Sequence, residues 1–255
     1  MLDLSTMCRR PGGVVMGWCS SGSPLLGEAM AVAGFDALTV DLQHGVQDFS
    51  DALRVLQAID GRGVPALCRV PWNEPGILMK ALDAGFQGII CPMIDDRAQA
   101  EQLARCCHYP PLGMRSFGPH RAMISIGDDY MDQAREGLVI LPMVETEAGL
   151  RNIDEILAVP GISGVYVGPN DLALALGYPA QAIPRAEVQS HIDHILARTK
   201  AAGKICGIAC GSAQMVANML AAGFHIATLQ NDLRLFLQGM SQQLADTRQL
   251  LEAVA

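Results

Sequence analysis

The sequence predicts a (β/α)8 barrel, or TIM barrel, in which eight parallel strands alternate with helices. Short apolar or β-branched runs alternate with amphipathic stretches along the whole chain, and there are eight such runs. These runs are almost continuously apolar, which is typical of parallel strands whose outer face is covered by helices. The length of 255 residues is that of a single barrel, so we expect one domain over residues 1–255.

The predicted strands are short and follow one another along the whole chain. They begin at Val14, Ala37, Pro65, Gly88, Leu138, Gly164, Lys204 and His225. Helical patterns lie between them, several opened by a Ser, Asp or Thr cap and closed by Gly, over residues 23–34, 76–85, 96–107, 146–159 and 212–223. An open, doubly wound sheet is the alternative. Residues 14–22 carry no Gly-x-Gly-x-x-Gly turn, which favours the closed barrel.

Two stretches do not fit the regular repeat. Residues 110–129 form a long connection rich in Gly and Pro, which follows the predicted helix at 96–107. Because such a connection is longer than an ordinary linker in a barrel, we expect a functional loop or a loop at a subunit contact. Residues 178–184 form a second insertion, just past the sixth strand.

The composition excludes several kinds of partner. The formal net charge is −8 and the pI is about 5.1, whereas nucleic acids and anionic membranes require a basic surface. The mean hydropathy of +0.25 is high, but each apolar run ends well before the roughly 18 residues that a membrane helix needs. We therefore expect no nucleic-acid partner and no membrane partner.

The cysteines and the N-terminus predict a cytoplasmic protein. Cys19, Cys68, Cys91 and Cys206 lie inside apolar strand-like runs, where a reduced thiol behaves as a small hydrophobic group, so disulfides are not expected. The first residues lack the apolar run and the small-residue cleavage site of a secretory signal.

Polar and ionisable residues follow several of the predicted strands. In a barrel of parallel strands the carboxyl ends all open on one mouth, where the chemistry of this fold takes place. Six residues at these strand ends are therefore candidates for an active site: Trp18, Asp41, His44, Arg69, Glu145 and Asp171.

Glu145 and Asp171 come from neighbouring predicted strands and indicate a metal site. Two carboxylates that share an apolar mouth repel each other, and a divalent cation removes that repulsion. Together with substrate oxygens and waters they would suit Mg²⁺ or Mn²⁺. The alternative is that each carboxylate caps the helix that follows its strand.

Arg69, His44 and Asn170 are candidates for substrate binding and proton transfer. The guanidinium of Arg69, in an apolar run, needs an anion or an enolate oxygen, or else a structural salt bridge. Asp41 precedes His44 by three residues and could orient its imidazole for acid–base catalysis, although most histidines have no such role. Backbone N–H groups at Asn170 and Asp171 would suit a carboxylate, or belong to an ordinary capped turn.

Four segments of the sequence together resemble one known family. They are GFDALTVDLQHG at 34–45, RVPWNEPGILMKALDAGFQGIICPMI at 69–94, YPPLGMRSFGPHRA at 109–122 and VETEAGLRNIDEILAVPGISGVYVGPNDLALALG at 144–177. The chain resembles the HpcH/HpaI aldolase and citrate lyase family, and in particular its class II, metal-dependent pyruvate aldolases. The resemblance runs nearly from end to end.

The resemblance implies a role for each candidate residue. Glu145 and Asp171 look like the ligands of a divalent cation, Mg²⁺, Mn²⁺ or Co²⁺, and Arg69 resembles the group that holds the keto or enolate oxygen. His44, supported by Asp41, looks like the acid–base group. The backbone amides of Asn170 and Asp171 would receive the pyruvate carboxylate, and Trp18 would line the pocket.

The resemblance also implies an assembly and a reaction. Asp83 matches a position that in the family reaches the active site of a neighbouring subunit, and the last helix packs on a partner barrel in a homo-oligomer, a hexamer or trimer. The reaction is the reversible cleavage of a 4-hydroxy-2-oxo acid to pyruvate and an aldehyde through a metal-stabilised pyruvate enolate, in sugar acid or aromatic catabolism. The sequence does not identify the aldehyde.

Two residues depart from the family pattern and keep other functions open. Gln43 stands where many relatives have Glu, and Met143 stands where several have Gln. A CoA-ester lyase of the citrate or malyl-CoA type is one alternative, although such enzymes tend to be longer chains with a basic surface. A non-catalytic pyruvate-binding barrel is the other.

Overall fold

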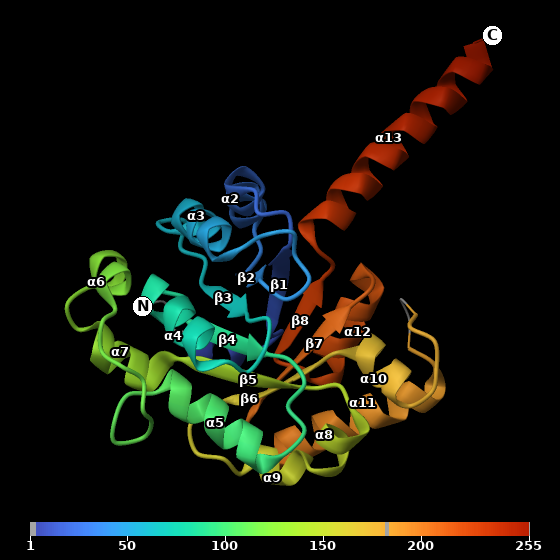
Figure 1. Cartoon of the computed structure of the whole chain (residues 1–255). Helices are drawn as coiled ribbons and strands as arrows, with labels where there is room; N and C mark the ends of the chain where they lie inside the picture. Colours follow the sequence, from blue (N-terminus) through green and yellow to red (C-terminus); the bar gives the residue numbers. More distant parts are fainter. Residues whose placement is uncertain (1–3, 182–183, 255) are drawn as a thin grey trace.

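The eight predicted strands close into a parallel barrel in chain order, which confirms the predicted fold. A computed structural model describes residues 4–181 and 184–254. Each strand pairs in parallel with the next, and β1 pairs with β8 to close the barrel (Figure 1). The strands are β1 Val14–Cys19, β2 Ala37–Asp41, β3 Ala66–Arg69, β4 Gly88–Cys91, β5 Val139–Val144, β6 Gly164–Val167, β7 Ile205–Cys210 and β8 Ile226–Leu229.

Helices follow the strands and cover the outside of the barrel (Figure 1). The predicted helices at 23–34, 76–85, 96–107 and 212–223 are present, and the one at 146–159 is divided into two short helices at Asn152. The helices are α1 Leu4–Cys8, α2 Pro24–Ala33, α3 Phe49–Ile59, α4 Pro75–Ala84, α5 Arg97–Cys107, α6 His120–Ile126, α7 Tyr130–Gly137, α8 Glu147–Arg151, α9 Ile153–Leu157, α10 Pro169–Ala175, α11 Ala186–Ala201, α12 Ala213–Ala222 and α13 Asp232–Val254.

The prediction of one long loop over residues 110–129 is wrong in part. Helix α6 occupies residues 120–126, and its buried Ala122 packs in the core, so the irregular segment ends at Pro119. Within that segment Arg115 is buried between the rings of Tyr109 and Tyr130, at 4.5 and 5.5 Å from the ring centroids. Of the second insertion, at 178–184, residues 182 and 183 lie outside the part of the chain that the structure describes.

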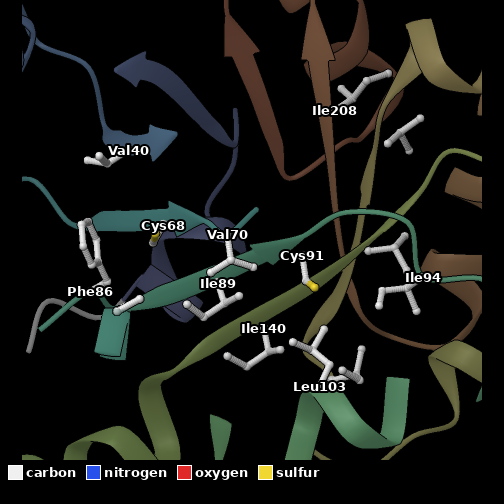
Figure 2. Close-up of a cluster of buried hydrophobic side chains, with 14 of the residues drawn as sticks. Val40, Cys68, Val70, Phe86, Ile89, Cys91, Ile94, Leu103, Ile140 and Ile208 are labelled. Atoms are coloured by element: carbon white, nitrogen blue, oxygen red, sulfur yellow. The ribbon is translucent and has the colours of Figure 1, made fainter. Parts of the chain in front are cut away.

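The barrel has two apolar layers because strand side chains alternate between two faces. One set points to the barrel axis and includes Met16, Leu67 and Leu141. The other set packs against the helices, and Figure 2 shows Ile140 of β5 beside Leu103 of α5. Both layers are almost fully buried, and the ionisable side chains that the strands carry, such as Asp41 and Arg69, lie at the strand ends.

The N-terminal helix α1 packs against the interior layer. Leu4 and Cys8 are buried in the same cluster as Val14 and Ile226, the residues that begin β1 and β8. Their place in the cluster puts α1 at the end of the barrel where strands begin. The opposite end, where strands stop, carries the polar side chains and is open to solvent at the cavity described below.

The last helix, α13, projects from the barrel as one long helix of 23 residues (Figure 1). Beyond its first turn it contacts little of its own chain, yet it carries exposed apolar side chains along its length: Leu233, Phe236, Leu237, Met240, Leu244, Leu250, Leu251 and Val254. Among the helices described, none has the length and apolarity needed to cross a bilayer.

A substitution at Gly164 tests how tightly the sixth and seventh strands pack. A Cβ atom on Gly164 would lie 1.8 Å from the carbonyl oxygen of Ile205, its partner in the β6–β7 pairing. We expect Gly164→Ala to lower the free energy of unfolding by about 2 kcal/mol or more, because backbone atoms have to move. Gly118→Ala is the control, since a Cβ there meets no atom within 4 Å. Equal stability of the two variants in urea unfolding would contradict the close approach.

Candidate active site

The two-residue period of the strands brings the predicted site residues to the open end of the barrel interior. On β5, Leu141 and Met143 face the axis, and Glu145 follows two residues later, directly after the strand. On β3, Leu67 faces the axis and Arg69 is the next inward residue. Each polar group thus stands one step above an apolar layer, at the carboxyl end of its strand.

Most of the predicted residues line one cavity of about 590 Å³ at this end. The cavity walls come from the ends of β1, β2, β3 and β5 to β8, together with the first turns of α10 and α13. The predicted residues that line it are Trp18, Asp41, His44, Arg69, Asn170 and Asp171.

Arg69 and Asp41 form a bidentate ion pair at the cavity floor. Arg69 Nε and Nη2 donate to the two Asp41 oxygens at 2.8 and 2.6 Å, and the guanidinium lies 4.8 Å from the centroid of the Trp18 ring. Burial alone would raise the pKa of Asp41, but the hydrogen bonds and charge of Arg69 hold that pKa below its usual value. The fork geometry fixes the guanidinium in direction as well as in place.

The carboxylate of Asp41 therefore pairs with Arg69, whereas the sequence suggested the imidazole of His44. Besides Arg69, Asp41 Oδ1 accepts backbone N–H bonds from Gln43 at 3.0 Å and from His44 at 3.4 Å. It holds the backbone at His44 rather than the imidazole. The His44 side chain is exposed and lines the cavity.

Glu145 is buried beneath the cavity lining, with 3% of its surface exposed. Its Oε1 accepts a 2.9 Å hydrogen bond from the backbone N–H of Met93, whose φ of 56° is in the left-handed region. That conformation is uncommon for a residue other than glycine and typically marks a functional constraint. On the other side, a Cβ at Gly168 would come within 2.3 Å of Glu145 Oε2, so any larger residue there would displace the carboxylate.

The electrostatics of Glu145 and Asp171 connect the two carboxylates. Burial, together with the nearby charge of Asp171, raises the pKa of Glu145 to about 7, although the Met93 hydrogen bond and Arg69 oppose the shift. Asp171 itself is exposed and lies in the first turn of α10, on the cavity wall. The two acidic groups are thus close enough for the charge of Asp171 to disfavour ionisation of Glu145.

The helix-capping alternative does not account for Glu145, whereas Asp171 does lie in the first turn of α10, where a carboxylate also interacts favourably with the helix dipole. The side chain of Thr146 caps α8 by accepting the Gly149 N–H at 2.9 Å, which leaves Glu145 outside the cap. At α10 the N-cap is Gly168, with no side-chain cap hydrogen bond. Within residues 4–181 and 184–254, no group of three or more His, Cys, Asp or Glu side chains is placed to hold a metal ion.

Asp83, another predicted site residue, does not line the cavity of its own chain. It lies on α4 and pairs with the buried Arg115, whose Nη2 donates to Asp83 Oδ1 at 2.6 Å. Arg115 Nη2 also contacts the Tyr130 hydroxyl at 3.0 Å. A role for Asp83 at an active site would have to be at the site of another copy of the chain.

Asp232 is a buried residue that the sequence did not single out. Its carboxylate accepts the backbone N–H of Ser20 at 2.9 Å and of Ser21 at 3.2 Å, and so ties the first residue of α13 to the end of β1. An acidic residue before a long amphipathic segment looks like an ordinary helix cap in the sequence. No local pattern indicates that its partners lie more than 200 residues away.

The two departures from the family pattern lie at the site. Met143 is 2% exposed and contributes to the cavity floor. Gln43 is half-buried, and its buried Oε1 has no hydrogen-bond partner among the described residues. Gln47, a buried neighbour, donates from Nε2 to the carbonyl oxygens of Cys19 and Asp41, at 2.7 and 2.9 Å. The Gln47 amide thus supports the backbone at Asp41.

Comparison with known proteins identifies the family to which this chain belongs. A profile of the family "HpcH/HpaI aldolase/citrate lyase" matches residues 14–239. Hydroxypyruvate/pyruvate aldolase of Rhizorhabdus wittichii is 45% identical over 92% of this chain and 94% of that protein. The 5-keto-4-deoxy-D-glucarate aldolase of Salmonella arizonae is 36% identical over 90% of both chains.

The fold comparison leads to the same family. The crystal structure of an HpcH/HpaI aldolase/citrate lyase family protein from Burkholderia cenocepacia J2315 superimposes with a TM-score of 0.90 at 30% identity, over 97% of this chain and 100% of that one. Both aldolase relatives are enzymes, and the match covers nearly their whole length, which argues against a non-catalytic barrel. The chain is therefore a member of the HpcH/HpaI aldolase/citrate lyase family and a carbon–carbon lyase of the aldolase kind.

Proposed function

We propose that the enzyme is a divalent-metal-dependent aldolase that reversibly cleaves a 4-hydroxy-2-oxo acid to pyruvate and an aldehyde. The observation that supports it best is the buried carboxylate of Glu145, coupled to Asp171 beside the Asp41–Arg69 pair. The names of the relatives agree, since they describe aldolases acting on pyruvate, hydroxypyruvate and a keto-deoxy sugar acid.

The residues fit a hard divalent cation, Mg²⁺, Mn²⁺ or Co²⁺. Glu145 and Asp171 offer carboxylate oxygens, the donors that such ions prefer, and their mutual repulsion is relieved by positive charge. When bound there, the cation would supply positive charge that lowers the energy of an enolate. The backbone bond from Met93 holds Glu145 ready for this role.

Arg69 and the start of α10 are proposed to hold the 2-oxo acid. Two N–H donors of Arg69 are used by Asp41, and the others remain for the keto oxygen, on which negative charge develops as the carbon–carbon bond breaks. The backbone N–H groups of Asn170 and Asp171, in the first turn of α10, would receive the carboxylate of pyruvate. Trp18 forms the adjoining wall and packs against the guanidinium.

His44 is proposed as the group that moves the proton. In cleavage it takes the proton from the C4 hydroxyl, the C3–C4 bond breaks, C4 becomes the aldehyde carbonyl, and the bonding electrons pass to the enolate of pyruvate. In condensation each step reverses, and the proton returns to the new hydroxyl. The structure supports this role by the position of His44 on the cavity wall and by the backbone bond that Asp41 makes to it.

We also propose that the enzyme works as a homo-oligomer, a hexamer or trimer, with α13 packed on another copy. The support is the row of exposed apolar side chains on a helix that extends away from its own barrel (Figure 1). In such an assembly Asp83 would reach a neighbouring active site, as the family resemblance implies. The half-exposed pairing of Asp83 with Arg115 leaves one carboxylate oxygen available for that contact.

The proposal places the enzyme in the cytoplasm, in the breakdown of sugar acids or aromatic compounds. The thiols of Cys19, Cys68, Cys91 and Cys206 are buried and reduced, as expected for an intracellular environment. Burial also raises the pKa of the Cys206 thiol to about 12, so these groups are poor nucleophiles and act as packing residues.

An assay of pyruvate release over a panel of 4-hydroxy-2-oxo acids, with added Mg²⁺, Mn²⁺ or Co²⁺, tests the proposed function. We expect turnover with the metals and none in excess chelator. Glu145→Gln and Asp171→Asn should each lower kcat/KM by about a hundredfold or more, because positive charge near the enolate is lost. Glu147→Gln, at an exposed carboxylate on α8, is the matched control. Full activity in chelator would overturn the metal role.

The raised pKa of Glu145 predicts how the metal-free protein responds to pH. The pKa of Glu145 is about 7 in the folded chain, against 4.5 for an unperturbed Glu. Because the folded state binds this proton more tightly than the unfolded state, the free energy of unfolding falls as the pH rises from 4.5 to 7. The full loss, up to about 3 kcal/mol, is reached above pH 7. Glu145→Gln should remove this loss.

Urea unfolding in chelator from pH 4.5 to 8 measures the effect. The difference in unfolding free energy between Glu145→Gln and the unsubstituted protein should grow across that range in favour of the variant. Glu147→Gln should follow the unsubstituted protein. Parallel profiles for all three proteins would show that the Glu145 carboxyl titrates normally.

A further inference from the structure

The loop that carries His44 connects the end of β2 to the start of α3 and spans residues 42–48. Two of its residues, His44 and Val46, are exposed and line the cavity. Gln47 is the exception among residues 43–48, because it is buried, with 8% of its surface exposed, and does not line the cavity. A buried amide in an otherwise open loop needs hydrogen-bond partners, and these partners show what it holds.

The side chain of Gln47 joins the ends of two strands. Its Nε2 donates to the carbonyl oxygen of Cys19, the last residue of β1, at 2.7 Å, and to that of Asp41, the last residue of β2, at 2.9 Å. The pairing of β1 with β2 ends at Cys19 and Val40, so the amide continues the connection between the strands beyond their ladder. Rotation of the amide by half a turn would place Oε1 against two carbonyl oxygens, which fixes its orientation.

The loop is therefore fastened to Asp41 on both sides of His44. The Asp41 carboxylate accepts the backbone N–H of His44 at 3.4 Å, and the Asp41 carbonyl accepts the amide of Gln47. These bonds lie within one chain, and Gln47 is already buried in that chain. The contacts are thus independent of how copies of the chain assemble.

The backbone between these two anchors lies close against the strand ends. A Cβ on Gly45 would be 2.3 Å from the Asp41 carbonyl oxygen and 3.1 Å from Gln47 Nε2. The N–H of the next residue, Val46, donates to the carbonyl of Ser20 at 3.0 Å. The loop has no room to shift inward, so release of the Gln47 amide would let it move outward and would displace the side chain that it carries into the cavity wall.

We propose that Gln47 is a positioning residue for His44: by fastening the loop to the ends of β1 and β2, it keeps the imidazole within reach of the substrate hydroxyl. This inference rests on the proposed role of His44 in proton transfer. Gln47 touches no reacting atom and acts through the loop. Its loss should therefore slow proton transfer and leave unchanged the binding of the substrate and the cation, which residues after β3, β5 and β6 are proposed to provide.

The test compares two variants of Gln47. Gln47→Leu keeps the size of the side chain and removes both donors, whereas Gln47→Asn draws the amide back by one methylene. Pyruvate release is measured with the 4-hydroxy-2-oxo acid that the unsubstituted enzyme cleaves fastest. We expect Gln47→Leu to lower kcat by about tenfold or more with KM unchanged within about threefold, and Gln47→Asn to show a smaller fall of the same kind. Gln57→Leu is the matched control, because Gln57 is exposed on α3 and does not line the cavity.

A second background, His44→Ala, separates positioning from general structural support. If Gln47 acts only through the imidazole, Gln47→Leu should change the kcat that remains in His44→Ala by less than about twofold. An equal loss of kcat in both backgrounds, or a kcat that Gln47→Leu leaves unchanged, would overturn the inference and leave the aldolase assignment standing.

Exchange of the pyruvate methyl protons for deuterium, which needs no aldehyde, reports the proposed enolate chemistry separately. If the unsubstituted enzyme shows neither exchange nor cleavage, the proposed function and this inference are both overturned.

Discussion

The structure of this site depends on one buried carboxylate. Glu145 stands at the end of an apolar strand with almost no exposure to water, and burial raises its pKa to about 7. An ionised carboxylate in such surroundings is unfavourable unless hydrogen bonds or positive charge stabilise it. The surroundings are arranged for that purpose: Met93 turns its N–H toward Glu145 in an unusual backbone conformation, and Gly168 leaves room for the second oxygen. A cation shared with Asp171 would complete the stabilisation.

The rest of the barrel makes this arrangement rigid. Side chains on the axis are apolar through most of the strands, and polar pairs appear only in the last inward positions, such as Asp41 with Arg69, and Tyr166 with Thr228 at 2.5 Å. The bonds within each pair hold both of its side chains in place, so the floor of the cavity keeps its shape without a ligand. Asp232 extends this order to α13, because it attaches the start of that helix to the end of β1.

The sequence predicts the features of this structure that follow from the regular spacing of apolar residues. The strands are recognisable as apolar runs, and counting in twos from Leu141 brings Glu145 to the cavity end of the interior. Contacts between segments that lie far apart in the chain leave no such periodic pattern in the sequence. Asp41 was expected to orient His44, but the nearby Arg69 offers two charged hydrogen bonds and takes both oxygens. Similarly, the left-handed Met93 is a bulky residue in a conformation that sequence patterns assign to glycine.

The most direct test of the central claim is a titration of the protein with Mn²⁺, followed by electron paramagnetic resonance, with and without pyruvate. The account predicts one Mn²⁺ per chain, bound more tightly when pyruvate is present, and loss of that site in Glu145→Gln while the far-ultraviolet circular dichroism is unchanged. If Glu145→Gln binds Mn²⁺ and pyruvate as well as the unsubstituted protein does, the buried carboxylate is not a metal ligand, and the account is wrong.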